Sequence, residues 1–388
     1  MLAVNVSDTR RKIYVSNFFF SLQFGLAFFF NATFLSSLGL SEKMVGIVFA
    51  LSYAASLVLL FSVPLLLRKF GNYSLFFSSS VFLVCVSALL AFSLSPIASV
   101  LLVATLIVLN IFLYTLLDIF LESAVDSTDG IGKEHGLFLT VTHGGRIVAQ
   151  LAAGTLLLWG GFTYLYGTVA GVVIILAFIT AFFLRNVREP VYEKLDFASV
   201  LLRLYYSTDM RHVFKLQFLL YLFYSIMAVY TPIYLYEYVG LSLGEMGIVF
   251  AIMLAPFFLL EILIGKFEDV RGEKGVLMYG FLILAVTTAA LSLISTSSIV
   301  IWTVALFATR IGALMVEMGN DVYFFKHIDA SKAAEVAAFR ALFPLAFAIG
   351  PFLGVVLLFF IPLYAIFASV GVIMLLGLVT ARTLTDIH

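Results

Sequence analysis

The sequence predicts an all-α integral membrane protein in which twelve transmembrane helices form two pseudo-symmetric six-helix bundles. Three observations support this fold class: an apolar composition, twelve apolar runs of membrane-spanning length, and an internal repeat. Hydrophobic residues make up 63% of the 388 residues and charged residues only 11%, whereas a soluble domain is about half apolar and about a quarter charged. This composition excludes an ordinary soluble enzyme.

The apolar runs each supply the roughly 20 residues that a helix needs to cross the hydrocarbon layer. The expected spans are residues 13–36, 44–67, 73–94, 97–121, 136–159, 162–184, 213–236, 244–264, 275–295, 298–321, 333–359 and 361–381. The first run is too long for the apolar core of a signal peptide, so we expect it to be retained. The polar stretch 185–212 predicts a linker between an N-terminal bundle (1–184) and a C-terminal bundle (213–388).

The basic residues orient these spans. If the N-terminus is inside, cytoplasmic segments hold eighteen of the 22 Lys and Arg residues, the outer loops hold only Lys43, and Arg146, Arg310 and Arg340 fall within spans. By the positive-inside rule both termini are cytoplasmic. We therefore expect a multi-pass protein of the plasma membrane.

An internal repeat relates the two bundles. Moving the sequence by 201 positions places residues 39–50 over residues 240–251, and eight of these twelve positions are identical, including a shared Gly-Leu-Ser. Six spans repeated in parallel around a cytoplasmic linker are an architecture of transporters, which bind substrate near the bilayer midplane and alternate access by rocking one half against the other.

The loop between the eighth and ninth expected spans carries a motif that resembles the signature of the major facilitator superfamily. Gly265, Asp269, Gly272 and Lys274 match its pattern, while Val270 stands where the family has an arginine. The resemblance implies a secondary transporter whose loop latches the cytoplasmic gate, with Asp269 as the latch. The expected gate loop comprises Glu261, Gly265, Lys266, Asp269, Arg271, Gly272 and Lys274. The alternative is a plain charged loop that satisfies the orientation rule.

A second element, Gly350-Pro351 with Gly354, resembles a pattern that antiporters of this family carry, although there it lies in the fifth span. Small residues let helices approach closely, and a proline frees backbone groups within a span. A deformable packing surface and a simple packing motif are both consistent with it.

Charges within the spans are the candidate coupling residues, because a central charge costs about 2.5–3.5 kcal/mol on insertion scales and persists mainly where it is paired. Arg310 is expected near the midplane. Its role is that of a substrate-anion anchor, of a modulator of a nearby carboxylate, or of a structural hydrogen-bonding group. Two acidic pairs at span ends are each followed by an arginine, and His143 titrates near neutral pH in its ordinary state. The first acidic pair and its arginine are Asp118, Glu122 and Arg146, and the second pair and its arginine are Glu317, Asp321 and Arg340. They are either proton carriers or fixed ion pairs.

Polar side chains on aromatic-rich spans are the expected cavity lining: Asn17, Gln23, Asn31, Asn110, Gln217, Tyr221 and Tyr224. Aromatic walls with few polar groups suit an amphipathic solute, so proton-coupled efflux of drug-like compounds is favoured. The alternatives are proton-coupled uptake of an organic anion or nutrient, and a transporter-like receptor or membrane enzyme. The expected partners are a small-molecule substrate, protons and membrane lipid, for a monomer. No cofactor, metal site or nucleic-acid partner is expected, and the single Cys85 excludes an intramolecular disulfide.

Overall fold

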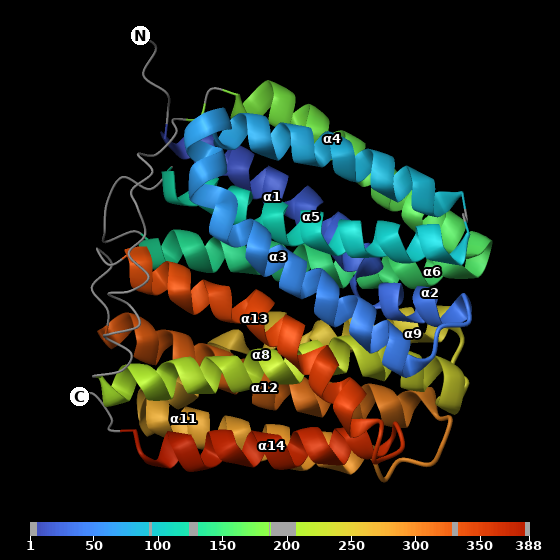
Figure 1. The fold of residues 1–388 in the computed structure, drawn as a ribbon. Helices are drawn as coiled ribbons and strands as arrows, with labels where there is room; N and C mark the ends of the chain where they lie inside the picture. The colour runs from blue at the N-terminus through green and yellow to red at the C-terminus, as the bar shows by residue number, and fades with distance from the viewer. Residues whose placement is uncertain are drawn as a thin grey trace. The chain divides into compact units, whose positions relative to one another are not determined.

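The computed structural model describes residues 6–92, 95–123, 131–185, 187, 207–327 and 333–384, and the regular elements in these ranges are helices (Figure 1). Contacts divide the chain into two compact units. Unit 1 comprises Met1–Gly39 and Leu51–Lys194, and unit 2 comprises Leu40–Ala50 and Leu195–His388. Most of the expected linker, residues 188–206, lies outside the described ranges. The division into an N-terminal bundle, a linker and a C-terminal bundle stays a prediction.

Unit 1 is built from helices that return on one another, with the first helix packed against the last. Its elements are α1 (Val6–Phe28), α2 (Phe30–Ser37), α3 (Glu42–Phe70, whose first turns belong to unit 2), α4 (Asn72–Ala91), α5 (Pro96–Ser123), α6 (Ile131–Ile179) and the π-helical η2 (Thr180–Leu184). The closest packing is between α1 and α6 and between α4 and α6. Helix α6 contacts both α1 and α4 because it is long enough to form two spans.

Unit 2 repeats this plan with more interruptions. Its elements are α8 (Thr208–Ile233), the π-helical η3 (Tyr234–Val239), α9 (Leu243–Leu254), α10 (Pro256–Leu259), α11 (Glu261–Leu291), α12 (Ile299–His327), α13 (Ala333–Leu357) and α14 (Ala365–Arg382). Helix α11 packs against α12 and α14, and α8 packs against α13 (Figure 1). Pro232 lies within α8 just before η3, which agrees with the bend that a proline introduces by removing a backbone donor.

The helices account for the twelve expected spans. In the described residues, ten helical stretches are long and apolar enough to cross a membrane, and Leu243–Leu259 is a shorter apolar stretch. One of the ten contains α6, whose 49 residues would extend about 70 Å if straight. This helix reverses at Gly160 and Gly161, where φ is +61° at Gly161, and it therefore supplies two spans. The stretch Leu243–Leu259 continues into the start of α11 and supplies another.

The internal repeat appears in the backbone as well as in the sequence. Gly39 and Gly240 lie 201 positions apart and have φ angles of +89° and +79°. Gly71 and Gly272 are separated by the same interval and have φ angles of +75° and +70°. Residues with a side chain rarely adopt this left-handed region. The glycines at these turns are therefore required by the backbone, and both halves turn at corresponding positions.

Much of the outer surface is apolar, as expected for helices in contact with lipid. Phe61, Phe178 and Phe182 are among the large apolar side chains that are more than half exposed, which a water-soluble protein would largely bury. Several helices extend beyond their apolar runs: α1 begins at Val6 and α12 continues to His327. Helical hydrogen bonding does not stop at the edge of the hydrocarbon layer, so hydropathy locates the span and underestimates the helix.

Candidate functional site

A buried arginine lies at the centre of unit 2. Arg310 is on α12 and only 3% exposed, and its guanidinium lies 5.2 Å from the ring centroids of both Phe223 and Tyr224 on α8. Contact with aromatic faces stabilises a cation that has lost its water. The Tyr224 hydroxyl in turn donates a 2.7 Å hydrogen bond to Oε2 of Glu317, further along α12. Tyr224 therefore contacts the arginine through its ring and the carboxylate through its hydroxyl.

The charged cluster continues toward one end of α12. Glu317 and Asp321 are four residues apart, so they lie on one face of the helix. Asp321 is within electrostatic reach of both Glu317 and Arg340, and Arg340 comes from α13. The structure thus brings Arg310, Glu317, Asp321 and Arg340, all named by the sequence analysis, into one network with Tyr224. We call these five residues the unit 2 charge cluster.

Buried amides lie beside this cluster. The Nδ2 group of Asn320 donates to Oε1 of Gln217 at 2.7 Å and to the backbone carbonyl of Val213 at 3.3 Å, which joins α12 to α8. Tyr221 packs edge-on against Phe343 at 5.4 Å and also contacts Tyr224. Gln217, an expected cavity residue, is 1% exposed and is hydrogen-bonded within unit 2.

The expected lining residues of the first span make hydrogen bonds within unit 1. Asn17 donates to the Phe138 carbonyl at 2.8 Å and to the Thr142 hydroxyl at 2.9 Å. Gln23 donates to Asn110 at 2.6 Å, and Asn31 accepts a 2.8 Å hydrogen bond from Tyr166. Hydrogen bonds of this kind connect helices in an apolar surrounding. The amides of Asn17 and Gln23 on α1 and of Asn31 on α2 therefore connect these two helices to α5 and α6.

Unit 1 also holds an arginine over an aromatic ring. The guanidinium of Arg146 on α6 lies 5.1 Å from the Phe24 ring centroid on α1. His143, one turn earlier on α6, and Tyr53 of α3 lie within electrostatic reach of Arg146. Asp118 of α5 is buried, whereas Glu122 at the end of the same helix is exposed. The two members of this acidic pair thus occupy different environments.

The expected gate loop forms the turn inside α11. Gly272 makes the reversal with φ +70° and ψ +167°, in agreement with the glycine requirement of the motif, and Gly265 lies in the preceding helical segment. The side chains of Glu261, Lys266, Asp269 and Arg271 are exposed, and that of Lys274 is partly buried. The latch role of Asp269 stays a prediction.

The buried carboxylates at this turn are two residues that the sequence analysis did not single out, Glu268 and Glu273. Glu273 forms an ion pair with Lys326 of α12. Its carboxylate accepts a hydrogen bond from the ammonium group and so raises the pKa of Lys326. The pair joins the turn to the end of α12. The spacing of charges along the sequence gave no signal for this contact, because the partners lie on different helices.

Glycines of α13 allow close packing against α8. A Cβ atom added at Gly350 would collide with Ser225, and one at Gly354 would enter the ring of Tyr230. The Tyr230 hydroxyl donates a 2.7 Å hydrogen bond to the carbonyl oxygen of Pro351. The Gly-Pro element is therefore a close helix contact in which a tyrosine hydroxyl satisfies a backbone acceptor, as its small residues predict.

The described helices supply twelve apolar spans, and Arg310 is buried among those of unit 2 while the other members of the charge cluster are half-buried. Residues 213–386 match the family model described as Major Facilitator Superfamily. The match covers less than half of the chain and lies in its C-terminal part. The apolar helices of membrane-spanning length make the protein a multi-pass membrane protein.

Solved structures share this fold at low sequence identity. The crystal structure of nucleoside transporter NupG superposes with a TM-score of 0.73 at 14% identity, over 98% of this chain and 100% of that chain. A mutant of the same transporter gives a TM-score of 0.74 at 13% identity, over 96% and 99%. Comparison of the sequence with curated proteins returns no match. At these identities the likeness shows the fold alone.

Proposed function

We propose that this protein takes up a small polar organic solute with a ring system, of the nucleoside class, by alternating access coupled to protons. The observation that carries the proposal is the link from Arg310 through Tyr224 to Glu317 inside the apolar bundle of unit 2. Charges in such a place are expensive and mark substrate or ion pathways.

The proton would be carried by Glu317. When the Glu317 carboxylate is protonated, it attracts Arg310 less and is a weaker hydrogen-bond acceptor for the Tyr224 hydroxyl. Binding of one proton would therefore weaken the hydrogen bond that joins α8 to α12 and also the attraction between Arg310 and Glu317 within α12. In this role Arg310 acts as the modulator of a neighbouring carboxylate, and its guanidinium becomes available to a polar substrate group when Glu317 is neutral.

The substrate class follows from the kinds of groups around the cluster. Aromatic rings and amides surround the charges of unit 2, and a nucleoside offers a flat base for the rings and hydroxyl groups for the amides. The solved structures of similar fold are those of a nucleoside transporter, and a nucleoside has this chemistry. Because their sequence identity to this chain is low, a nucleoside is a candidate to be tested. It corresponds to the nutrient-uptake alternative of the sequence analysis.

Efflux of an amphipathic compound by proton antiport is the second candidate. It is favoured by the run of contacting rings along α1, in which Phe24 lies 6.2 Å from Phe20 and 4.8 Å from Phe28. Such a surface would suit an apolar solute. An apolar solute, however, would have no use for the charge cluster of unit 2. Uptake of a polar solute uses both the rings and the charges.

The test is uptake by proteoliposomes with a pH gradient of either direction. The panel contains a purine nucleoside, a pyrimidine nucleoside, an organic anion and a cationic amphipathic dye. We expect nucleoside accumulation when the outside is acidic, and its loss in Glu317→Gln, whereas Glu237→Gln, the same change at an exposed position, retains it. Movement of the dye alone, or gradient-driven uptake that survives Glu317→Gln, would refute the proposal in its substrate or in its coupling residue, respectively.

A further inference from the structure

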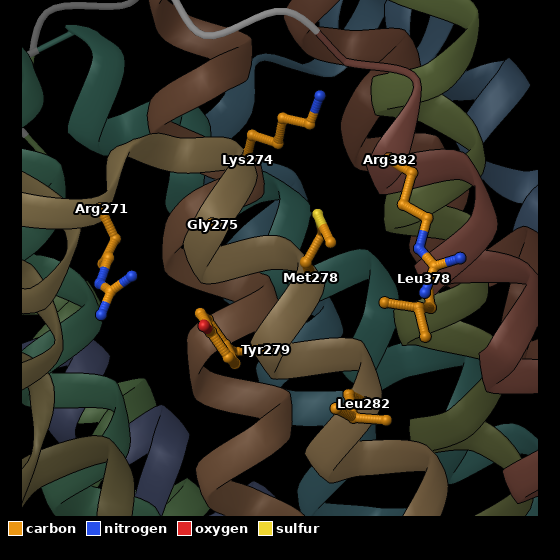
Figure 2. Close-up of a pocket in the computed structure, with 8 residues that line it drawn as sticks. All are labelled: Arg271, Lys274, Gly275, Met278, Tyr279, Leu282, Leu378 and Arg382. Atoms are coloured by element: carbon orange, nitrogen blue, oxygen red, sulfur yellow. The ribbon is translucent and has the colours of Figure 1, made fainter.

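A groove runs along the outer face of unit 2 between α11 and α14, away from the charge cluster. It has a volume of about 380 Å³ and is lined by Arg271, Lys274, Gly275, Met278, Tyr279, Leu282, Leu378 and Arg382 (Figure 2). Tyr279 and Leu282 are 44% and 42% exposed, so the groove opens on the surface that lipid covers. Its lining residues differ from those of the proposed transport site.

The groove is basic at one end and apolar along its length. Lys274, Met278 and Leu282 follow one another at four-residue intervals on α11, and Leu378 and Arg382 do so on α14, so each series lies on one helix face. Figure 2 shows Lys274 and Arg382 at the end where the two helices leave the bundle, and Leu282 deeper along the groove. Arg271, just before Gly272, also lines the groove, and Figure 2 shows its guanidinium pointing away from Lys274 and Arg382.

The two helices that line the groove pack closely against each other. A Cβ atom at Gly371 would meet the backbone of Ala285, and one at Gly377 would enter the ring of Phe281. The backbones of α11 and α14 therefore approach each other there, and the larger side chains form walls on either side. At the basic end a Cβ atom on Gly275 would lie 3.1 Å from Cβ of Arg271, so this glycine gives the arginine side chain room beside the helix.

We propose that this groove is a binding site for an anionic phospholipid of the membrane leaflet that contacts the basic ends of α11 and α14. An arginine guanidinium matches phosphate oxygens with two parallel hydrogen bonds, and Arg271, Lys274 and Arg382 all line the groove and give it a positive charge. The methylene chains continue along Met278, Leu282 and Leu378, and the Tyr279 ring lies at the depth where tyrosines contact both headgroup and chain.

Charge complementarity and the apolar wall together select this occupant. Basic pockets between transmembrane helices at the cytoplasmic side bind anionic headgroups, and the positive-inside distribution places these helix ends on that side. Among the described residues, Arg271 and Arg382 have no hydrogen-bond or ion-pair partner that would occupy their guanidinium groups. A soluble anion would use the three cations and gain nothing from the adjoining apolar wall.

The experiment is native mass spectrometry of the full-length protein titrated with phosphatidylglycerol and, separately, with phosphatidylcholine. Each cation near a membrane surface changes anionic-lipid affinity about fivefold. The double variant Arg271→Gln, Arg382→Gln is therefore expected to bind phosphatidylglycerol about thirtyfold more weakly, with phosphatidylcholine unchanged. Lys266→Gln, the control at an exposed position of the same loop outside the groove, is expected to bind as the wild type does.

A second variant tests the groove without changing its charge. Leu378→Trp fills the apolar wall and is expected to weaken phosphatidylglycerol binding while all three cations remain. Undiminished binding by the double variant, an equal loss in Lys266→Gln, or displacement of the lipid by equimolar inorganic phosphate would each overturn the proposal. The first result would place the lipid elsewhere, the second would indicate diffuse surface charge, and the third would indicate a site for a soluble anion.

Discussion

Arg310→Gln is expected to destabilise unit 2 mainly through the carboxylate that it leaves behind. The substitution removes a guanidinium from two aromatic rings at 5.2 Å, each contact being worth about 0.5–2 kcal/mol. It also takes a cation from the surroundings of Glu317. Removing one partner leaves the other charge uncompensated, and because Glu317 is only half-buried the cost is expected to lie below the value of about 3–5 kcal/mol for a fully buried pair. The loss of a few kcal/mol is a large part of the stability of a typical domain.

A double-mutant cycle with Glu317→Gln measures whether the two residues act together. Each single variant leaves one charge, whereas the double variant removes both, so its loss is expected to be smaller than the sum by about 1–3 kcal/mol. Equilibrium unfolding of the purified protein in mixed detergent micelles gives the four free energies. The matched control cycle pairs Glu317→Gln with Arg271→Gln, at an exposed arginine, and should be additive. Additivity of Arg310 and Glu317 within about 0.5 kcal/mol would refute the charge-cluster interpretation.

Three further predictions concern packing, the turn and the orientation. Gly354→Ala places a methyl group in the ring of Tyr230 and should cost about 1–3 kcal/mol in the same unfolding assay. Gly167→Ala, with open space around its Cβ position, should be neutral or stabilising. Equal effects of the two variants would contradict the close contact. Lys326→Gln leaves the buried Glu273 without its ion pair and should lower the melting temperature more than Lys266→Gln does, and the reverse order would argue against the pair. In a Cys85→Ser background, an impermeant maleimide should label Lys43→Cys on intact cells and Lys266→Cys only after permeabilisation, and labelling from one side would contradict the orientation.

The span pattern could be predicted from the sequence because it depends on composition over long windows. Apolar runs of about 20 residues locate the spans whatever their neighbours are. The repeat was also visible, since Gly39 and Gly240 must adopt the same left-handed backbone conformation, and a side chain at either position would be strained. Composition did not predict the helix extensions, such as that of α12 to His327. These segments are too polar to score as apolar in a hydropathy window.

The partners of the polar residues could be predicted only in part. Of the charges that the sequence placed within spans, Arg310 and Asp118 are buried, Glu122 is exposed and the others are half-buried. It did not indicate that Asn320 would hold Gln217, or that Tyr166 would hold Asn31. These helices are apolar on most faces, so periodicity does not fix which face is turned toward the bundle. A hydrogen bond between helices depends on that rotation, which only the packed structure provides.

Arg146 and Arg310 show how duplicated halves reach the same local solution on different helices. Arg146 lies over Phe24 of α1, the first helix of unit 1, and Arg310 lies over Phe223 of α8, the first helix of unit 2. Yet Arg146 is on α6 and Arg310 on α12, which do not correspond under the repeat. The repeat therefore does not align the two arginines, although each lies over a ring on the first helix of its own unit. If the proposed role of Glu317 is correct, Arg310→Gln should abolish the response of transport to the pH gradient. Arg146→Gln, which leaves the Tyr224–Glu317 hydrogen bond intact, should change the rate of transport and preserve that response. Loss of the response in both variants would mean that coupling is shared between the units.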